Sequence, residues 1–325
     1  MKEAVLRLLK EHQPEYVSGE ELCKVLDVTR TAVWKHIQTL REDGYDIDAR
    51  PRVGYLLVGI PDRLYAEEIC NGLTTEFIAR QVFYFSSLSS TNDLAKKLSS
   101  NVVGVSNGSI VVAEEQTGGR GRLGRKWFSL KYKAICFSLI LYPPVNPSEA
   151  SQVTMVTAVA LAIAIRKETG VRVGIKWPND LLVGGKKLCG ILTELGAEID
   201  KINYLIVGAG ININQEPGEF PEDVRDTATS LKIEMGVTVN RVKLLQAILI
   251  EFEQWYKIWL EQGFPKILTK WKELTVSLQC PVRINAVDRS WDGWAVDVDQ
   301  DGALLLRLPD GQLQRVVAGD VSLRI

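Results

Sequence analysis

A glycine-rich basic segment, residues 116–127, contains the residue types that bind phosphate: Gln-Thr-Gly-Gly-Arg-Gly-Arg-Leu-Gly-Arg-Lys-Trp. Residues 118–133 carry six cations and no acid. Arginine binds phosphate in a bidentate manner, and glycine lets backbone N–H groups approach an anion closely. No Gly-Lys-Ser/Thr follows and no GxGxxG opens a helix, so the spacing is neither a Walker A nor a dinucleotide-binding motif. The segment predicts a polyphosphate or anion site; the alternative is a flexible basic surface loop, such as an RNA-binding tract.

Three further clusters at expected strand ends are candidates for the same site. Lys-Trp-Pro-Asn-Asp at 176–180 closes a strand with a rigid polar turn, and Lys-Lys-Leu-Cys-Gly-Ile at 186–191 places a cation at the start of an apolar strand. Gly-Ala-Gly-Ile-Asn at 208–212 ends another strand in small residues and an asparagine. Each cluster alone is more often a turn than a site. Strand ends that carry Lys, Asn, Asp and Gly together favour a site.

A second kind of chemistry is indicated near the N-terminus, where residues 28–40 contain no acid. Val33, Ile37 and Leu40 have the spacing of a buried helix face. A polar set is then left outward, able to reach phosphates or base edges in a major groove: Thr29, Arg30, Thr31, Lys35 and Gln38. Arg50 and Arg52 lie at an expected hairpin tip and could contact phosphate. Because residues 1–60 carry nine Lys/Arg against ten Asp/Glu, the alternative is a domain used for packing or protein contact.

The elements that position this polar set have the order of a winged helix-turn-helix. Ser-Gly-Glu-Glu at 18–21 has the form of a capping box, which predicts a helix over 19–26. Thr29 is the expected N-cap of a helix over 30–43, which Gly44 ends. A hairpin is expected over 47–58. Residues 61–62 are the expected linker.

The middle segment mixes strands and helices irregularly, which predicts an α+β fold with a mixed sheet. Strands are expected at 109–113, 134–141, 171–176, 188–194 and 204–210, and helices at 92–98, 147–169, 240–262 and 264–274. The last segment reads as short strands at 282–287, 291–298, 303–307, 313–317 and 321–325, which favour a small closed barrel. The predicted domains are therefore 1–60, 61–275 and 276–325.

Bulk composition limits the class of protein. A length of 325 residues predicts two or three domains, and 46% hydrophobic with 24% charged residues is typical of globular proteins. The most apolar stretch, 153–165, is shorter than the roughly 20 residues that span a bilayer, so a buried helix is expected. Five cysteines without CxxC spacing argue against a disulfide framework or zinc site, and no signal peptide is recognised. We expect a cytoplasmic protein without a membrane partner.

Five motifs, in the same order, resemble those of the biotin–protein ligases, specifically the bifunctional bacterial form that also represses the biotin operon. They are Ser-Ser-Thr-Asn at 89–92, Gln116 with residues 119–127, and the segments 176–180, 187–192 and 208–212. With the winged helix they cover essentially the whole chain. The resemblance implies a catalytic domain similar to class II aminoacyl-tRNA synthetases and a C-terminal SH3-like barrel.

The resemblance also implies the reaction of a biotin–[biotin carboxyl-carrier protein] ligase. Biotin and Mg-ATP give biotinyl-5′-AMP and pyrophosphate, and the adenylate then acylates a lysine of a biotin carrier domain. It further implies that biotinyl-AMP promotes a homodimer that binds operator DNA of biotin genes. Mg²⁺ would be held through ATP rather than at a protein-only site.

Residue roles follow from the same resemblance. Lys187 and Arg122 would be catalytic, because both would stabilise charge on the carboxylate and the α-phosphoryl oxygens. The expected biotin contacts are Ser90, Thr91, Asn92, Gln116, Arg120, Gly121, Arg122 and Lys187. The expected ATP or adenylate contacts are Arg122, Arg125, Lys126, Trp127, Asn179 and Asn212. Asp180 would position the metal or the incoming lysine. Phe220 is the only aromatic residue in the 212–226 segment, where the family has a loop over adenine, so the adenine cap is left open.

Two other functions remain alternatives. A pure regulator would sense a small anion with the same α+β domain and no chemistry; Lys187 and the basic segment favour the enzyme. Another carboxylate adenylator, such as a lipoate ligase, would share the catalytic fold; the Gly-Arg-Gly-Arg segment and the winged helix favour the biotin enzyme.

Overall fold

The computed structural model describes residues 1–101, 103–198, 201–286, 289–317 and 319–323. The chain forms two compact units, Met1–Arg63 and Leu64–Ile325. The division falls after Arg63, one residue beyond the expected linker at 61–62. The last segment is not separated from the middle one, because both belong to the second unit. Val287 and Ile325, the ends of two expected strands, lie outside the described residues.

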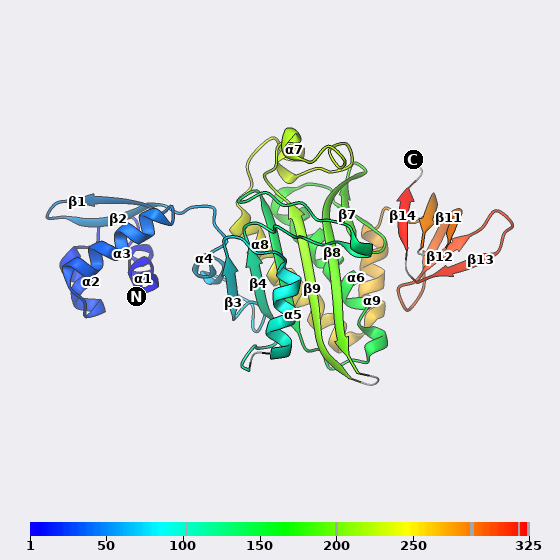
Figure 1. The fold of residues 1–325 in the computed structure, drawn as a ribbon, viewed down its shortest axis with the longest axis horizontal. Coiled ribbons are helices and arrows are strands. Elements are labelled where there is room, and N and C mark those ends of the chain that lie inside the picture. Colours follow the sequence, from blue (N-terminus) through cyan, green and yellow to red (C-terminus); the bar gives the residue numbers. More distant parts are fainter. Residues whose placement is uncertain (102, 199–200, 287–288, 318, 324–325) are drawn as a thin grey trace. The chain divides into compact units, whose positions relative to one another are not determined.

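The first unit is three helices followed by a hairpin: α1 (Lys2–Glu11), α2 (Gly19–Leu26), α3 (Arg30–Glu42), β1 (Asp46–Arg50) and β2 (Gly54–Gly59) (Figure 1). The two predicted N-caps are confirmed, since Ser18 Oγ accepts from Glu21 N at 3.0 Å and Thr29 Oγ1 from Ala32 N at 3.3 Å. Gly44 follows α3 with a φ of 98°, which favours glycine. The winged helix-turn-helix order is therefore confirmed.

The second unit is built on a seven-stranded mixed sheet in the order β3-β4-β5-β9-β8-β7-β6. Its strands are β3 (Val82–Phe85), β4 (Ser109–Ala113), β5 (Ala134–Leu141), β6 (Gly174–Lys176), β7 (Asp180–Val183), β8 (Lys186–Ala197) and β9 (Ile202–Asn212). Among the described strand pairs of this sheet, β3 and β4 are parallel and the others are antiparallel. The α+β prediction is confirmed. The strand expected over 171–176 is shorter than predicted, and β3 and β7 were not predicted.

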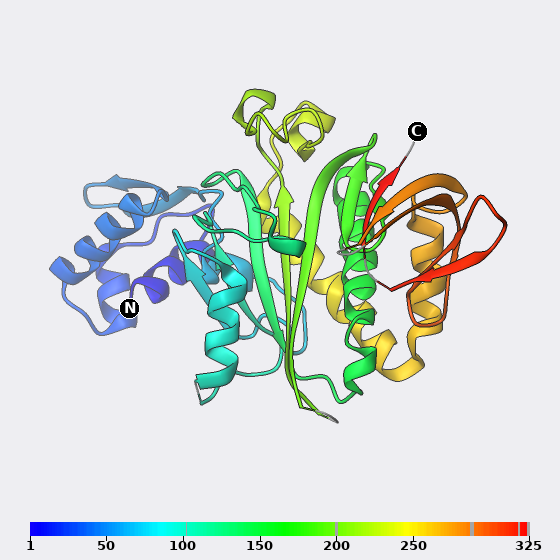
Figure 2. The same cartoon turned by 45° about the vertical axis from the view of Figure 1, so that its right-hand side comes forward.

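Helices cover both faces of this sheet (Figures 1 and 2). α6 (Gln152–Thr169), α8 (Arg241–Gln262) and α9 (Phe264–Leu274) pack on one face, where they form the large core, and α5 (Thr91–Asn101) packs on the other. The short elements are α4 (Ala66–Cys70), α7 (Leu231–Met235), η1 (Arg122–Gly124), η2 (Pro147–Glu149) and η3 (Pro217–Glu219).

One helical stretch, Pro147–Thr169, is long and apolar enough to cross a membrane by length and composition alone. It includes α6, and its most apolar window is 67% buried within the protein. Core helices of soluble proteins pass the same test. Because α6 packs against α8 and the sheet, its apolar surface is accounted for by the core.

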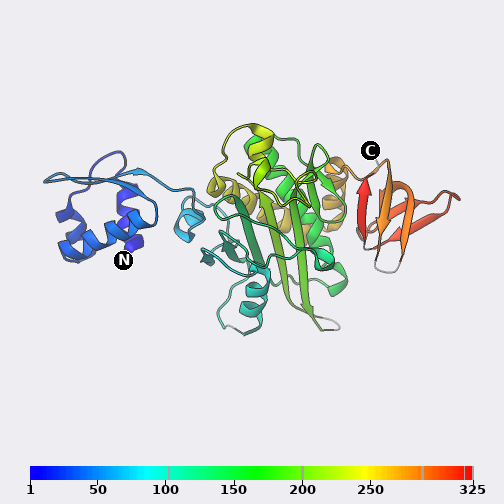
Figure 3. The ribbon, with the colours of Figure 1, turned by 45° about the horizontal axis from the view of Figure 1, so that its top comes forward.

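The C-terminal strands form an antiparallel sheet in the order β13-β12-β11-β10-β14 (Figure 3). They are β10 (Cys280–Asn285), β11 (Ser290–Val298), β12 (Leu304–Arg307), β13 (Leu313–Val316) and β14 (Asp320–Leu323). Trp177 Nε1 donates to Gly302 O at 3.0 Å and Lys272 pairs with Asp297 at 2.6 Å, so this sheet packs on the preceding residues. No pairing joins β13 to β14 among the described residues, and barrel closure stays a prediction.

Candidate active site and nucleic-acid interface

The face of the sheet that packs against α5 carries four small residues, which we call the floor of the site: Ser138, Gly190, Gly208 and Gly210. Side chains alternate between faces along a strand, so the odd positions of β5 and β9, such as Phe137 and Val207, point into the helical core. The even positions face α5, where Ser138 lies opposite Gly208 and Gly190 lies opposite Gly210. Two neighbouring strand pairs thus leave space on one face. This space is where side chains from the loops can gather.

A hydrogen-bonded polar cluster lies on the first part of this floor. Gln116 Oε1 accepts from Thr91 N at 2.8 Å and from Thr91 Oγ1 at 3.1 Å. Ser138 Oγ lies 2.7 Å from Thr91 Oγ1 and 2.6 Å from Asn92 Oδ1. Ser90 is buried, and its Oγ accepts from Asp93 N at 3.3 Å. Four residues expected to contact biotin are therefore brought together in a polar site, of which all but the partly exposed Gln116 are buried.

Gly208 makes room for this cluster. A Cβ atom at this position would lie 2.1 Å from Asn92 Oδ1. Asn92 also donates through Nδ2 to Glu194 Oε2 at 2.8 Å, and this fixes the amide orientation. The position of the Asn92 side chain therefore depends on the absence of a side chain at residue 208.

The basic segment folds back on itself above the start of α5. Gly118 N donates to Ser89 O at 2.9 Å, which attaches the segment to the residues before the helix. Gly121 N donates to Arg125 O at 2.7 Å and Trp127 N to Gly119 O at 2.9 Å. These bonds form a tight turn whose backbone is held beside the polar cluster. Arg125 and Lys126 are exposed on it.

Arg120 lies in an ion-pair network. Its guanidinium pairs with Asp93 and lies 3.5 Å from Glu194 Oε1. Lys96 Nζ lies 2.9 Å from the same Glu194 oxygen and 3.3 Å from Asp93 Oδ1. The network joins the basic segment to α5 and β8. It also shares Glu194 with Asn92, so the Arg120 side chain is coupled to the polar cluster.

Arg122 reaches the turn between β6 and β7. Its Nη1 donates to Asn179 Oδ1 at 3.3 Å and to Gly319 O at 3.4 Å. Asn179 is held in turn, because its Nδ2 donates to Ile191 O at 2.6 Å. Two residues expected to contact the adenylate are therefore neighbours, although they are 57 residues apart in the sequence.

Trp127, Lys187 and Asp180 form the second part of the site. Lys187 Nζ lies 2.7 Å from Asp180 Oδ1 and 6.0 Å from the centroid of the Trp127 ring. Asp180 is buried and lies opposite Gly190 on β8. A Cβ atom at Gly210 would lie 2.3 Å from the Trp127 indole, so the ring depends on that glycine.

The Trp127 indole N–H is buried and has no hydrogen-bond partner among the described residues. Buried donors are normally satisfied by protein, water or ligand. A Cβ atom at Gly210 would lie 2.4 Å from Nε1, so this edge of the indole is covered by the sheet and the ring packs directly on the glycine.

The 212–226 segment begins at the end of β9. Asn212 is buried, and its Oδ1 accepts from Gln215 Nε2 at 3.0 Å. Phe220 is only 4% exposed, so its ring is packed away from solvent. Directly after the segment, Thr227 O accepts a hydrogen bond from Lys187 N at 2.7 Å. This bond attaches the end of the segment to the start of β8.

A buried ion pair supports the site from beneath. Arg241 Nη1 lies 2.6 Å from Glu114 Oε2, and both side chains are fully buried. Glu114 Oε1 also accepts from Leu64 N at 2.7 Å. This carboxylate precedes Gln116 by two residues and fixes the end of β4.

Burial raises the pKa of the nearby Cys136 thiol to about 11, so this thiol stays neutral at physiological pH.

Three residues of this site were missed by sequence reasoning: Asp93, Ser138 and Glu194. Asp93 follows a recognised motif directly, and Glu194 is an acid within an apolar strand, which is a signal. Ser138 gives no local signal, because its role depends on its neighbours across the sheet. Among the described residues no group of three or more His, Cys, Asp or Glu could hold a metal.

The outward face of α3 carries the polar set expected to contact DNA. Val33, Ile37 and Leu40 are buried, whereas Thr29, Arg30, Thr31 and Lys35 are exposed and Gln38 is partly exposed. Trp34, which was not predicted, is 53% exposed on the same helix.

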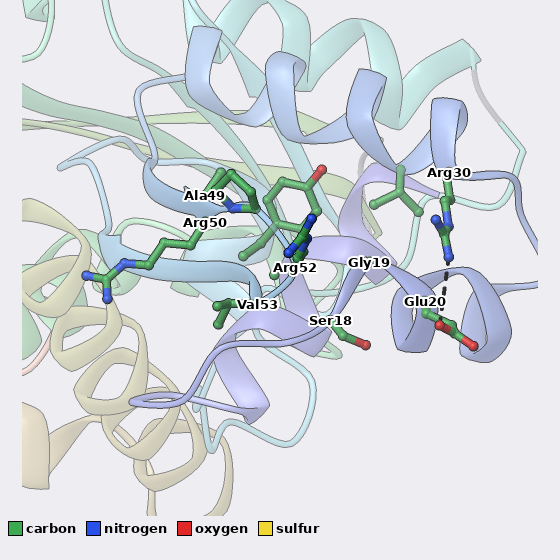
Figure 4. A pocket seen from close by; sticks show the side chains of 12 residues that line it. Ser18, Gly19, Glu20, Arg30, Ala49, Arg50, Arg52 and Val53 are labelled. Atoms are coloured by element: carbon green, nitrogen blue, oxygen red, sulfur yellow. Dashed lines mark ion pairs between the residues drawn. The ribbon is translucent and has the colours of Figure 1, made fainter.

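A groove of about 430 Å³ lies between the starts of α2 and α3 and the hairpin tip. Figure 4 shows Arg30 turned toward Glu20, whose Oε2 lies 3.7 Å from its Nη2, and Arg50 pointing away from this pair. Arg50 Nε donates to Asp48 Oδ2 at 3.0 Å. Arg52 is exposed at the tip with a φ of 64°. The expected wing arginines thus lie at the hairpin tip, and Arg52 lines the groove.

Family models match three parts of the chain. One described as HTH domain matches residues 2–56, and one described as Biotin/lipoate A/B protein ligase family matches residues 84–212. A third, described as Biotin protein ligase C terminal domain, matches residues 281–324.

Whole-length relatives are similar to the chain. It is 37% identical to the bifunctional ligase/repressor BirA of Bacillus subtilis over 323 residues, which are 99% of this chain and 98% of that protein. It is 32% identical to the Escherichia coli protein of the same description over 310 residues, 95% of this chain and 94% of that protein.

A solved structure resembles the second unit's fold. The biotin protein ligase from Aquifex aeolicus in complex with biotin and ATP aligns with a TM-score of 0.64 at 30% identity. The alignment covers 75% of this chain and 99% of that chain.

Proposed function

The chain belongs to the family of bifunctional biotin–protein ligases and repressors, and from this membership we propose how its residues carry out both activities. It is an ATP-dependent biotin–protein ligase that also acts as a transcriptional repressor. The observation that carries this function is the 37% identity to a bifunctional ligase/repressor over 99% of the chain. The floor of glycines beneath Trp127, beside Lys187, supports the placement of the site.

Biotin would occupy the polar cluster of Ser90, Thr91, Asn92 and Gln116. Ser90, Thr91 and Asn92 are buried, and Gln116 is hydrogen-bonded to Thr91, so the cluster would discriminate strongly against a ring without matching polar atoms. Its carboxylate would point toward the basic segment, where Gly121 and Arg122 lie. Arg120 would turn from Asp93 and Glu194 to reach it.

ATP would lie with its base against the Trp127 ring, which itself packs on Gly210. Asn212 would give hydrogen bonds to the nucleotide. Arg122, Arg125 and Lys126 would contact the phosphates, and Asn179 would hold Arg122 in place. Adenylation forms a bond from a biotin carboxylate oxygen to the α-phosphorus and breaks the bond from that phosphorus to the bridging oxygen of pyrophosphate.

Lys187 would lie between the carboxylate and the α-phosphoryl oxygens. Negative charge increases on these oxygens during attack, and a fixed ammonium group stabilises it. In the second step the neutral amine of the carrier lysine attacks the acyl carbon, an amide forms and AMP leaves. Asp180 would position that amine or accept its proton. Mg²⁺ bound to the ATP phosphates would neutralise part of their charge.

Repression would follow from ligand-linked dimerisation. Ordering residues 116–127 and 212–226 costs conformational entropy, which the bound adenylate offsets, so a dimer that uses the ordered segments forms more easily. Paired α3 helices would then contact a two-fold symmetric operator, with Thr29, Arg30, Thr31, Lys35 and Gln38 in the major groove and Arg50 and Arg52 on phosphate. Both partners, a carrier domain and operator DNA, would be met in the cytoplasm.

One experiment tests the ligase. The protein is incubated with Mg-ATP, labelled biotin and a biotin carrier fragment, and the carrier lysine is examined by mass spectrometry. We expect ATP-dependent biotin on that lysine. Labelled lipoate in parallel separates a lipoate ligase, and binding of labelled biotin without transfer would indicate a sensor.

A further inference from the structure

The outward face of the recognition helix α3 carries a large aromatic side chain, Trp34, that is exposed to solvent. Trp34 is 53% exposed, and its ring makes no hydrogen bond or ring contact with any residue that the structure describes. Exposing so much of an indole to water is unfavourable, because it forfeits the burial of a large apolar surface. A surface that keeps such a residue is a candidate contact surface.

The neighbours of Trp34 identify the chemistry of the partner. Arg30 precedes it by one helical turn and Gln38 follows it by one turn, so all three side chains lie along one stripe of the helix. Lys35 is adjacent and exposed, and residues 28–41 contain no acid. A basic and amide-bearing stripe suits phosphates and base edges, whereas an apolar protein partner would leave these groups unpaired.

Within a major groove, the indole has one matching apolar group. The C5-methyl of thymine is the apolar feature of the groove, and the other base edges present hydrogen-bond donors and acceptors. We propose that Trp34 reads thymine by packing its ring on a C5-methyl group of the operator, and so adds sequence specificity to the polar contacts of α3. This inference rests on the proposed repressor function.

The polar residues around Trp34 are suited to phosphates and polar base edges, which leaves the thymine methyl group to Trp34. Arg30 already has a weak surface ion pair with Glu20, in which both side chains are at least 80% exposed, so it is available to phosphate at little cost. Trp34 lacks any such alternative. The helix therefore offers one residue for thymine and several for charge and hydrogen bonding.

The test uses the full-length protein with biotin and ATP. Its preferred duplex is first selected from a random-sequence pool, and each thymine is then replaced by deoxyuridine, which lacks only the methyl group. For the unaltered protein we expect affinity to fall about fourfold at one or two thymines per half-site, the value of one buried methyl group. Trp34→Ala should lose about tenfold in affinity and bind both duplexes equally, while Trp34→Phe should retain part of the preference.

Val58→Ala is the matched control, because Val58 is 58% exposed on β2 of the same unit. It should bind like the unaltered protein, and ligase activity should be unchanged in all variants because the ligase site lies in the second unit. Unchanged far-UV circular dichroism and thermal unfolding report that the first unit is folded in each variant. The inference is wrong if Trp34→Ala still prefers thymine over deoxyuridine, or if no deoxyuridine replacement weakens binding of the unaltered protein. Neither result would contradict the proposed repressor function. Failure of the loaded protein to select any duplex overturns the repressor function itself.

Discussion

The ammonium group of Lys187 lies 2.7 Å from the carboxylate oxygen Oδ1 of Asp180. Asp180 is buried at the start of β7, and Lys187 is the second residue of β8, so two adjacent strands bring the pair together. The carboxylate holds the lysine close to the Trp127 ring before any substrate binds. A cation fixed in this way needs little reorganisation when charge develops beside it.

Replacement of Lys187 by glutamine should lower the rate of adenylate formation by about 100- to 1,000-fold, the effect of removing one preorganised group that stabilises transition-state charge. Lys186→Gln is the matched control, because Lys186 is adjacent and exposed. Single-turnover measurement of biotinyl-AMP formation separates this rate from substrate binding. Equal rates for both variants would contradict the role of Lys187.

Two glycines on β9 should affect the two substrates differently. Gly208→Ala places a Cβ atom against Asn92, and we expect the KM for biotin to rise about tenfold through the disturbed hydrogen bonds. Gly210→Ala places a Cβ atom against Trp127, and the KM for ATP should rise by a similar factor.

Gly19→Ala controls for both, because Gly19 lies in the first unit and a Cβ atom there meets only Tyr55 Cε2, at an ordinary contact distance of 3.8 Å. KM values for biotin and ATP are measured for all three variants. If Gly208→Ala and Gly210→Ala each raised the KM values of biotin and ATP equally, the proposed placement of biotin beside Gly208 and of ATP beside Trp127 and Gly210 would be wrong.

Replacement of Arg122 by glycine should release the adenylate early. The side chain joins the basic segment to Asn179 and to Gly319 O, and its loss removes both contacts and a phosphate ligand. We expect the dissociation rate of biotinyl-AMP to rise about tenfold or more, with non-specific acylation of other proteins and weaker repression. Rapid dilution from the adenylate complex measures this rate, and an unchanged value counts against the assignment.

The free energy of unfolding should fall as the pH rises from about 9 to about 11. Burial raises the pKa of Cys136 from 9.0 to about 11, so in this range the unfolded thiol loses its proton and the folded thiol keeps it. The unfolded state then binds fewer protons, and stability decreases by about 2–3 kcal/mol from this group. Denaturant titration across this pH range should show a shallower decrease for Cys136→Ser, and an identical decrease would exclude the contribution of Cys136.

Much of the fold could be predicted because its signals are local. α2, α3 and α9 begin and end within one residue of their expected positions, since Ser18, Thr29 and the proline after Phe264 mark their starts. β6 is shorter than expected, because residues 171–173 include the apolar Val171 and Val173 yet pair with no strand. β7 was missed because four residues after a proline turn carry too little periodicity.

The parts of the site that could be predicted are those with unusual sequence, such as residues 116–127. The contacts of Arg120 with Glu194, and of Asn92 with Ser138, join residues from different strands and helices. Such pairings are set by sheet register, which the sequence does not display.

The central claim is that this site joins biotin to the α-phosphorus of ATP before any carrier is involved. Biotin-dependent exchange of labelled pyrophosphate into ATP, measured without carrier protein, tests it most directly. We predict exchange that requires biotin and is lost in Lys187→Gln but kept in Lys186→Gln. Exchange that does not need biotin, or no exchange while ATP and biotin are both bound, would contradict the account.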